Sequence, residues 1–183
     1  MEQDKRSRTI VFAAHCLLNQ NAKVEGLAGC AGMLEPLVEL LAGEGAGVIQ
    51  MPCPEVACLG PGRPPGTDTR EQYDTPQYRK TCRLIASQMA ELMSSYAKNG
   101  CTVACILGVE GSPSCSVARA PVLDGRGKRV LVPGKGIFIE ELSYAMDKEG
   151  LDVPVIGIPE VEEAGDIGDA LSRTRKAIRS TGS

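Results

Sequence analysis

The stretch ILGVEGSPSCS, residues 106–116, decides how the chain is organised. Its first residues end an apolar run, 101–107, that has the composition of a buried β-strand. The run breaks at glycines and a Gly-Ser-Pro turn, and Cys115 follows on this polar loop. Hydroxyl and backbone N–H groups flank Cys115, and such groups stabilise a thiolate. The stretch therefore predicts a central strand that ends in a loop carrying a cysteine suited to chemistry.

Two further cysteines come directly after strand-like segments. Cys16 follows the apolar run at 9–14, and Cys53 follows a shorter run at 47–51. A fourth strand is expected at 153–158. Helical spacing of apolar residues predicts the helices between these strands, at 34–43, 75–98, 136–148 and 166–179.

This alternation of strands and helices predicts an α/β fold. We expect one Rossmann-like or flavodoxin-like domain at 9–179, with a parallel sheet of about four strands and helices on both faces. Short tails at 1–8 and 180–183 flank the domain. The Pro- and Gly-rich segment 58–74 is expected to be an ordered active-site loop, and 121–132 a hairpin that turns at Asp-Gly.

The strand order decides where the cysteines lie. Ligands bind to such sheets at the carboxyl ends of strands, at the point where the strand order reverses. In the order 2-1-3-4, the first strand lies between the second and third. The loops that carry Cys16, Cys53 and Cys115 would then meet at this point.

Composition narrows the classes of protein. With 183 residues the chain is long enough for one domain with its own core. A formal net charge of −3 gives no excess of basic residues that would indicate binding to a nucleic acid polymer. No apolar run approaches the roughly 20 residues that cross a bilayer. The charged N-terminus is unlike a signal peptide. We therefore expect a cytoplasmic protein with no membrane partner; the sequence gives no indication of an oligomer.

Eight cysteines are many for such a chain, and metal binding, catalysis and burial all remain open as their role. The chain has no Cys-x-x-Cys pair and one histidine, which argues against a ribbon-type zinc site. Three converging cysteines would leave one position open on a tetrahedral metal or on one iron of a cubane cluster. The alternative is that the cysteines are scattered core residues, as we expect of Cys82, Cys101 and Cys105.

Three motifs resemble those of the thiouracil desulfurase (desulfidase) family, in the family's order. They are AHCLLN at 14–19, PCPEV at 52–56 with GRPP at 62–65 behind it, and GSPSC at 111–115. The resemblance implies a [4Fe-4S] cluster held by three cysteines, which match Cys16, Cys53 and Cys115, with one iron open. It also implies release of sulfide from a thiolated nucleobase. Asn19 and Ser116 stand where the family pattern has glycine, which indicates a divergent branch of desulfidases.

The expected reaction is hydrolytic. The thiocarbonyl sulfur of a small substrate would bind the open iron, and a carboxylate would activate water to attack the carbon. Glu55 and Glu110 are the candidate bases, each with an N-cap or solvated carboxylate as its alternative role. Ser112 and Ser114 could donate hydrogen bonds or only satisfy their own turn. His15 could shuttle protons, or serve as a buried histidine bonded to backbone.

Two other functions compete with the desulfidase. The first is a non-catalytic protein that binds or senses an iron–sulfur cluster or zinc through the same thiolates. The second is a flavodoxin-like nucleotide binder whose cysteines belong to the core. A protein without iron after reconstitution would leave the nucleotide binder or a zinc protein, and sulfide release identifies the enzyme.

Overall fold

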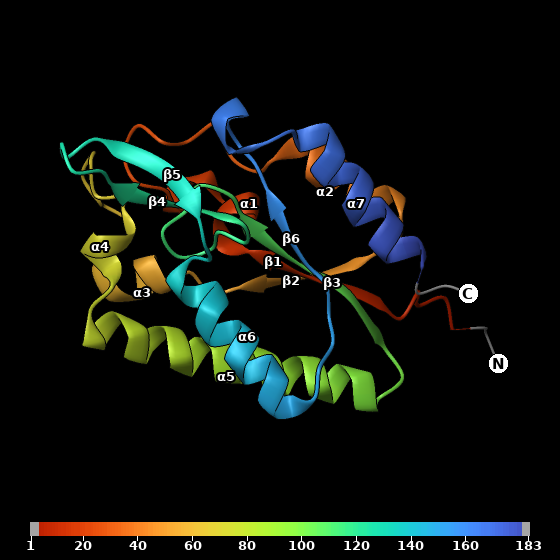
Figure 1. Ribbon diagram of the computed structural model, residues 1–183. Helices are drawn as coiled ribbons and strands as arrows, with labels where there is room; N and C mark the ends of the chain where they lie inside the picture. Colours follow the sequence, from red (N-terminus) through yellow and green to blue (C-terminus); the bar gives the residue numbers. More distant parts are fainter. Residues whose placement is uncertain (1–3, 181–183) are drawn as a thin grey trace.

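A four-stranded parallel sheet forms the centre of the computed structural model, which describes residues 4–180 (Figure 1). The sheet order is β2-β1-β3-β6, and β6 is the fourth of these strands along the chain, so the predicted order 2-1-3-4 is confirmed. The strands are β1 (Thr9–Ala14), β2 (Gly47–Met51), β3 (Thr102–Val109) and β6 (Val155–Ile158). Because all four are parallel, their carboxyl ends lie at one edge of the sheet.

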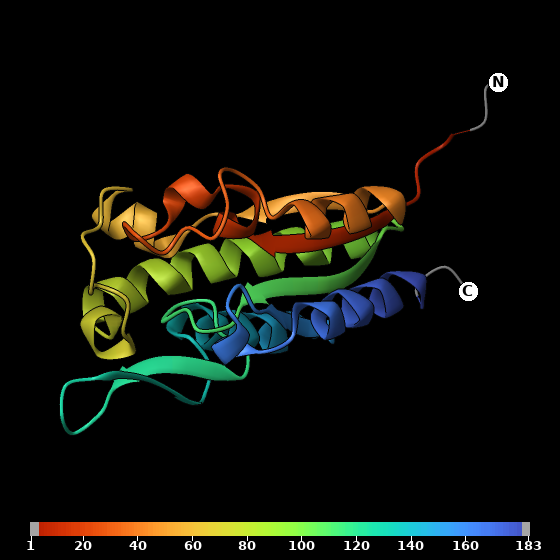
Figure 2. The same cartoon turned by 90° about the horizontal axis from the view of Figure 1, so that it is seen from above.

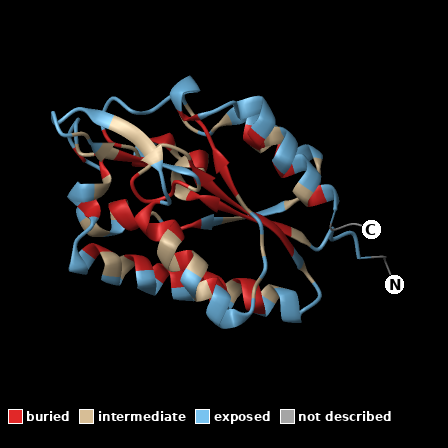
Figure 3. Cartoon of the chain, in the orientation of Figure 1, coloured by how far each residue is buried: buried red, intermediate tan, exposed pale blue. Residues whose placement is uncertain are grey.

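The apolar strands of the sequence occupy the middle of the sheet. Strands β1 and β3 are buried along almost their whole length, whereas the edge strand β2 exposes residues such as Val48 (Figure 3). A strand covered on both faces has no polar side to present, which is why its sequence is a continuous apolar run. The register pairs Ala14 with Met51 and Ala13 with Leu107, so the ends of these strands are level.

Helices cover both faces of the sheet, as predicted. Helices α5 (Pro76–Lys98) and α6 (Ile137–Glu149) pack together on one face, and α2 (Glu35–Gly43) and α7 (Ile167–Arg179) lie on the other (Figure 1). Two of them begin at side-chain caps. The Thr75 hydroxyl accepts a hydrogen bond from the Tyr78 N–H, and the Asp166 carboxylate accepts one from the Asp169 N–H.

The expected hairpin is present as a second, two-stranded antiparallel sheet. It consists of β4 (Arg119–Leu123) and β5 (Arg129–Pro133), and the Asp124 carboxylate closes its turn by accepting from the N–H groups of Arg126 and Lys128. Figure 2 shows that the hairpin projects from the end of the molecule at which the sheet strands finish. It can therefore form a wall of any site built on that edge.

Several segments expected to be loops contain short helices. They are α1 (His15–Leu18), η1 (Gln20–Ala22), α3 (Pro54–Leu59), α4 (Arg70–Tyr73) and η2 (Glu162–Ala164). Pro54 at the first position of α3 and a Thr69–Gln72 capping box before α4 provide the local reasons. The segment 58–74, expected to be an ordered loop, contains the end of α3 and the whole of α4.

The tails expected at 1–8 and 180–183 lie partly outside the described residues, at 1–3 and 181–183. Within residues 4–180, none of the helices is long and apolar enough to cross a membrane.

Candidate functional site

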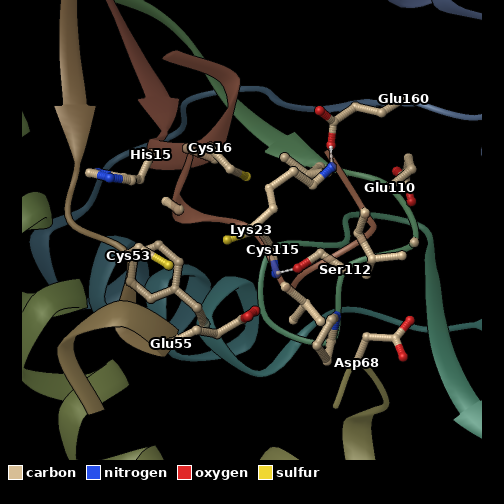
Figure 4. A pocket seen from close by; sticks show the side chains of 18 of the residues that line it. His15, Cys16, Lys23, Cys53, Glu55, Asp68, Glu110, Ser112, Cys115 and Glu160 are labelled. Atoms are coloured by element: carbon tan, nitrogen blue, oxygen red, sulfur yellow. Dashed lines mark hydrogen bonds and ion pairs between the residues drawn. The ribbon is translucent and has the colours of Figure 1, made fainter. Parts of the chain in front are cut away.

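One cavity of about 120 Å³ lies at the carboxyl edge of the sheet, and three cysteines line it (Figure 4). Cys16 lies in the short helix after β1, Cys53 directly precedes α3 after β2, and Cys115 lies in the loop after β3. In Figure 4 their side chains come from three separate segments and turn toward the same space. Three strand ends thus deliver three thiols to one place.

Burial in this cavity keeps the three thiols protonated. Burial is the main cause that raises the pKa of Cys53 to about 11, and the charge of Glu55 contributes to this increase. Burial is also the main cause of the raised pKa values of Cys16 and Cys115, and the other two cysteines add to the effect at Cys115. A bound cation would be needed to draw the protons off, because thiolates are the metal-binding form.

The loop that carries Cys115 is fixed by backbone hydrogen bonds. The Cys115 carbonyl accepts from the Val109 N–H at 2.9 Å, which folds the loop back onto β3. The first turn of α6 donates to the loop from the other side, from Ile137 N–H to the Pro113 carbonyl and from Phe138 N–H to the Ser114 carbonyl. The N–H groups of a helix start need such partners, so α6 and the cysteine loop stabilise each other.

Gly136 permits this close approach. A Cβ added there would lie 2.7 Å from the Cys115 nitrogen and would also overlap the Ser114 carbonyl group. We predict that Gly136→Ala displaces the cysteine loop and lowers the free energy of unfolding by about 1–3 kcal/mol, the usual cost of overpacking. Urea unfolding measures this change.

Gly43→Ala is the matched control, because a Cβ at this helix-terminal glycine meets nothing within 4 Å. It should be neutral or slightly stabilising. Equal unfolding midpoints for the Gly136→Ala protein and the wild type would contradict the role of Gly136.

Glu55 is held at the cavity by a buried polar network. The Ser114 hydroxyl donates to its Oε1 at 2.6 Å, and the Arg63 guanidinium lies 3.1 Å from its Oε2. The Tyr78 hydroxyl lies 2.5 Å from the Ser114 hydroxyl, behind it. Burial raises the pKa of Glu55, and the contacts with Ser114 and Arg63 oppose this shift. The result is an oriented carboxyl group with a raised pKa.

Ser114 itself is fully buried, and its hydroxyl is engaged with Tyr78 and Glu55. Ser112 lines the cavity, but its hydroxyl accepts from the N–H groups of Ser114 and Cys115, at 3.2 and 3.0 Å. Both serines therefore order the loop and the carboxylate in this structure.

Glu110 also lines the cavity, and its carboxylate is used by the backbone. It accepts from the N–H groups of Ala118 and Arg119 at 3.0–3.2 Å, at the start of β4. Gly157 of β6 leaves room for this side chain, because a Cβ there would overlap the carboxylate. These contacts give Glu110 a structural task that Glu55 does not have.

His15 and Cys58 take up positions that sequence reasoning left open. His15 lines the cavity through α1, but in Figure 4 its ring turns away from the three sulfur atoms. Partial burial lowers its pKa. Cys58 belongs to α3 and packs against the core. Cys82 and Cys105 are buried core residues, as expected.

Sequence reasoning missed four charged residues of the cavity. Lys23 pairs with Glu160 at 2.5 Å, and Arg129 of the hairpin pairs with Asp68 at 2.6 Å. Glu160 could have been found, because it follows β6 at the same edge as the cysteines. Lys23 and Asp68 lie on connecting segments and Arg129 is the first residue of β5, and none of the three has a local signal.

Two metal groups that bind cysteine, a zinc ion and a [4Fe-4S] cluster, can be compared with the side chains of this cavity. Among the described residues, no three His, Cys, Asp or Glu side chains form a group that could hold a metal ion. In a zinc site each cysteine sulfur lies about 2.3 Å from the ion. The sulfur atoms of the ligands are therefore nearly in van der Waals contact with one another. A [4Fe-4S] cluster binds each cysteine through a different iron, and its ligands stay further apart. The three thiols that line one cavity are the ligand type of a [4Fe-4S] cluster, so the residues present fit such a group.

No family model matches the chain. The chain is 28% identical over 158 residues to the uncharacterised protein MJ0003 of Methanocaldococcus jannaschii, covering 86% of this chain and 90% of the relative. Among solved structures it is similar to a [4Fe-4S]-dependent thiouracil desulfidase, TudS, with 24% identity and a TM-score of 0.45. That alignment covers 80% of this chain and 90% of the other.

Proposed function

We propose that the protein is an iron–sulfur desulfidase in which Cys16, Cys53 and Cys115 hold a [4Fe-4S] cluster and a small thiocarbonyl compound is hydrolysed. The observation that carries the proposal is that these three thiols line one cavity beside an oriented carboxylate. A bound cluster with one open iron would supply Lewis acidity and affinity for sulfur. The sequence motifs around the three cysteines support the same function.

Glu55 is the general base in this proposal. It would take a proton from water as the oxygen attacks the thiocarbonyl carbon. The carbon–sulfur bond then breaks, sulfur leaves as hydrogen sulfide, and the carbon ends as a carbonyl. Ser114 and Arg63 fix the carboxylate, and they do so from positions that are themselves buried.

The remaining polar groups have supporting roles. Glu110 holds the start of β4 through two backbone N–H groups, which leaves it less free than Glu55 to accept a proton. Ser112 keeps the Cys115 backbone in place. We also place the protein in the cytoplasm, where thiols stay reduced until a cluster is inserted, with a small thiolated molecule as its partner.

Anaerobic reconstitution tests the proposal. Protein loaded with iron and sulfide should be brown and contain about four irons and four sulfides per chain. Incubation with 2-thiouracil should then release sulfide and form uracil in equal amounts. A loaded protein that releases no sulfide from any thione would support a non-catalytic cluster protein. Failure to bind iron at all would overturn the assignment.

A further inference from the structure

A second charged pair faces the cavity from the side opposite Glu55 (Figure 4). The Lys23 ammonium lies 2.5 Å from Glu160 Oε2, and only 15% of the lysine side chain and 8% of the glutamate side chain are exposed. Gln20 holds this pair in place. Its amide donates to Glu160 Oε1 at 2.5 Å and to the Cys16 carbonyl at 2.9 Å, and its oxygen accepts from the Gly29 N–H.

The three cations of the cavity differ in how far their donors are used. The terminal nitrogens of Arg63 bind Glu55 and the carbonyls of Gly60 and Ala22, and its Nε is buried without a hydrogen-bond partner among the described residues. Arg129 binds Asp68 and the Gly111 carbonyl.

Lys23 has more N–H donors than its ion pair with Glu160 uses. An ammonium carries three N–H donors, and Glu160 is the partner that the structure gives to Lys23 among the described residues. Its charge acts on both Cys16 and Glu55, where it opposes the pKa increase that burial causes. The ammonium therefore lies within electrostatic reach of both the proposed cluster ligand and the proposed base.

We propose that Lys23, positioned by Glu160 and Gln20, donates a hydrogen bond to an uncharged acceptor on the substrate ring, so that the site selects heterocyclic thiones that carry a second carbonyl oxygen. This rests on the proposed function, because the reacting carbon is placed between Glu55 and the cysteines. Glu160 already neutralises the lysine, so a neutral oxygen suits it better than an anion. Apolar side chains form the walls that would face the ring, among them Val24, Leu27, Leu131 and Val161.

Product binding tests this contact without relying on turnover. Uracil has two carbonyl oxygens, whereas 2-pyridone has the same ring size and only one. Calorimetric titration of the cluster-loaded protein should show tighter binding of uracil than of 2-pyridone. In a Lys23→Met/Glu160→Gln double variant, uracil binding should weaken by about 10- to 100-fold, the usual worth of a hydrogen bond to a charged group. Binding of 2-pyridone should stay near the wild-type value.

The double variant is chosen because it removes both charges at once. Lys23→Met alone leaves the Glu160 charge uncompensated beside Cys16, so it should lose iron, and the double variant should regain it. The Lys23→Arg variant keeps a cationic donor at this position, so it should retain part of the preference for uracil over 2-pyridone. Lys135→Met is the control, since the Lys135 ammonium bonds to Ser143 Oγ on α6.

Three results would overturn the inference. They are equal weakening of both ligands in the double variant, unchanged uracil binding in that variant, and no preference for uracil in the wild type. If no thione is hydrolysed but the ligand preference follows the prediction, the desulfidase proposal fails and the role of Lys23 stands.

Discussion

Replacing Cys16, Cys53 or Cys115 with alanine is expected to reduce bound iron from about four atoms per chain to a small fraction of that. Each substitution removes one of only three anchors, and the cavity offers no neighbouring thiol among the described residues that line it. Iron and acid-labile sulfide, measured after anaerobic reconstitution, report the loss directly. The visible absorbance of the cluster should disappear in parallel.

The matched controls are Cys82→Ala and Cys105→Ala, which remove thiols of the same size from the core. They should cost roughly 1 kcal/mol of unfolding free energy through lost packing and keep their iron. Circular dichroism of all five variants establishes that they are folded. Equal iron loss in the cavity variants and the core variants would refute the assignment of the three ligands.

Glu55→Gln is expected to lower turnover by roughly 10²–10⁴-fold, the usual contribution of a general base, while iron content stays unchanged. Glutamine keeps the shape of the side chain, and its carbonyl oxygen can still accept from Arg63. The Ser114 hydroxyl can accept from the new amide, because its own proton can be given to Tyr78. The network therefore survives while the proton acceptor is lost. Sulfide release under steady-state conditions is the measurement.

Glu110→Gln separates the two carboxylates. Its carboxylate caps backbone N–H groups at the start of β4, and a glutamine oxygen can still accept from one of them. We expect some loss of stability and turnover close to the wild-type rate. A large loss of turnover in Glu110→Gln together with full activity in Glu55→Gln would reverse the assignment of the base. Full activity in both variants would exclude both carboxylates and leave His15 as the next candidate.

The sequence by itself determined the strands and helices and their alternation. Uninterrupted apolar runs at β1 and β3 indicated strands buried on both faces, and the helix ranges followed from the helical spacing of apolar residues. These signals arise from contacts within a few residues along the chain, so they can be read from a local pattern. The positions of the three cysteines directly after strands are local in the same sense.

Only the tertiary structure decided which polar groups meet in the cavity. Lys23 and Glu160 are 137 residues apart, and Glu55 reaches Ser114 across 59 residues. The sequence left Glu110 open as a candidate base or as a solvated or N-cap carboxylate, and in the fold it accepts from backbone N–H groups at the start of β4. Such pairs depend on strand order and on the path of the connecting segments. A side chain's partner across the sheet edge leaves no periodic trace in the sequence around it, and so no local pattern could have identified these contacts.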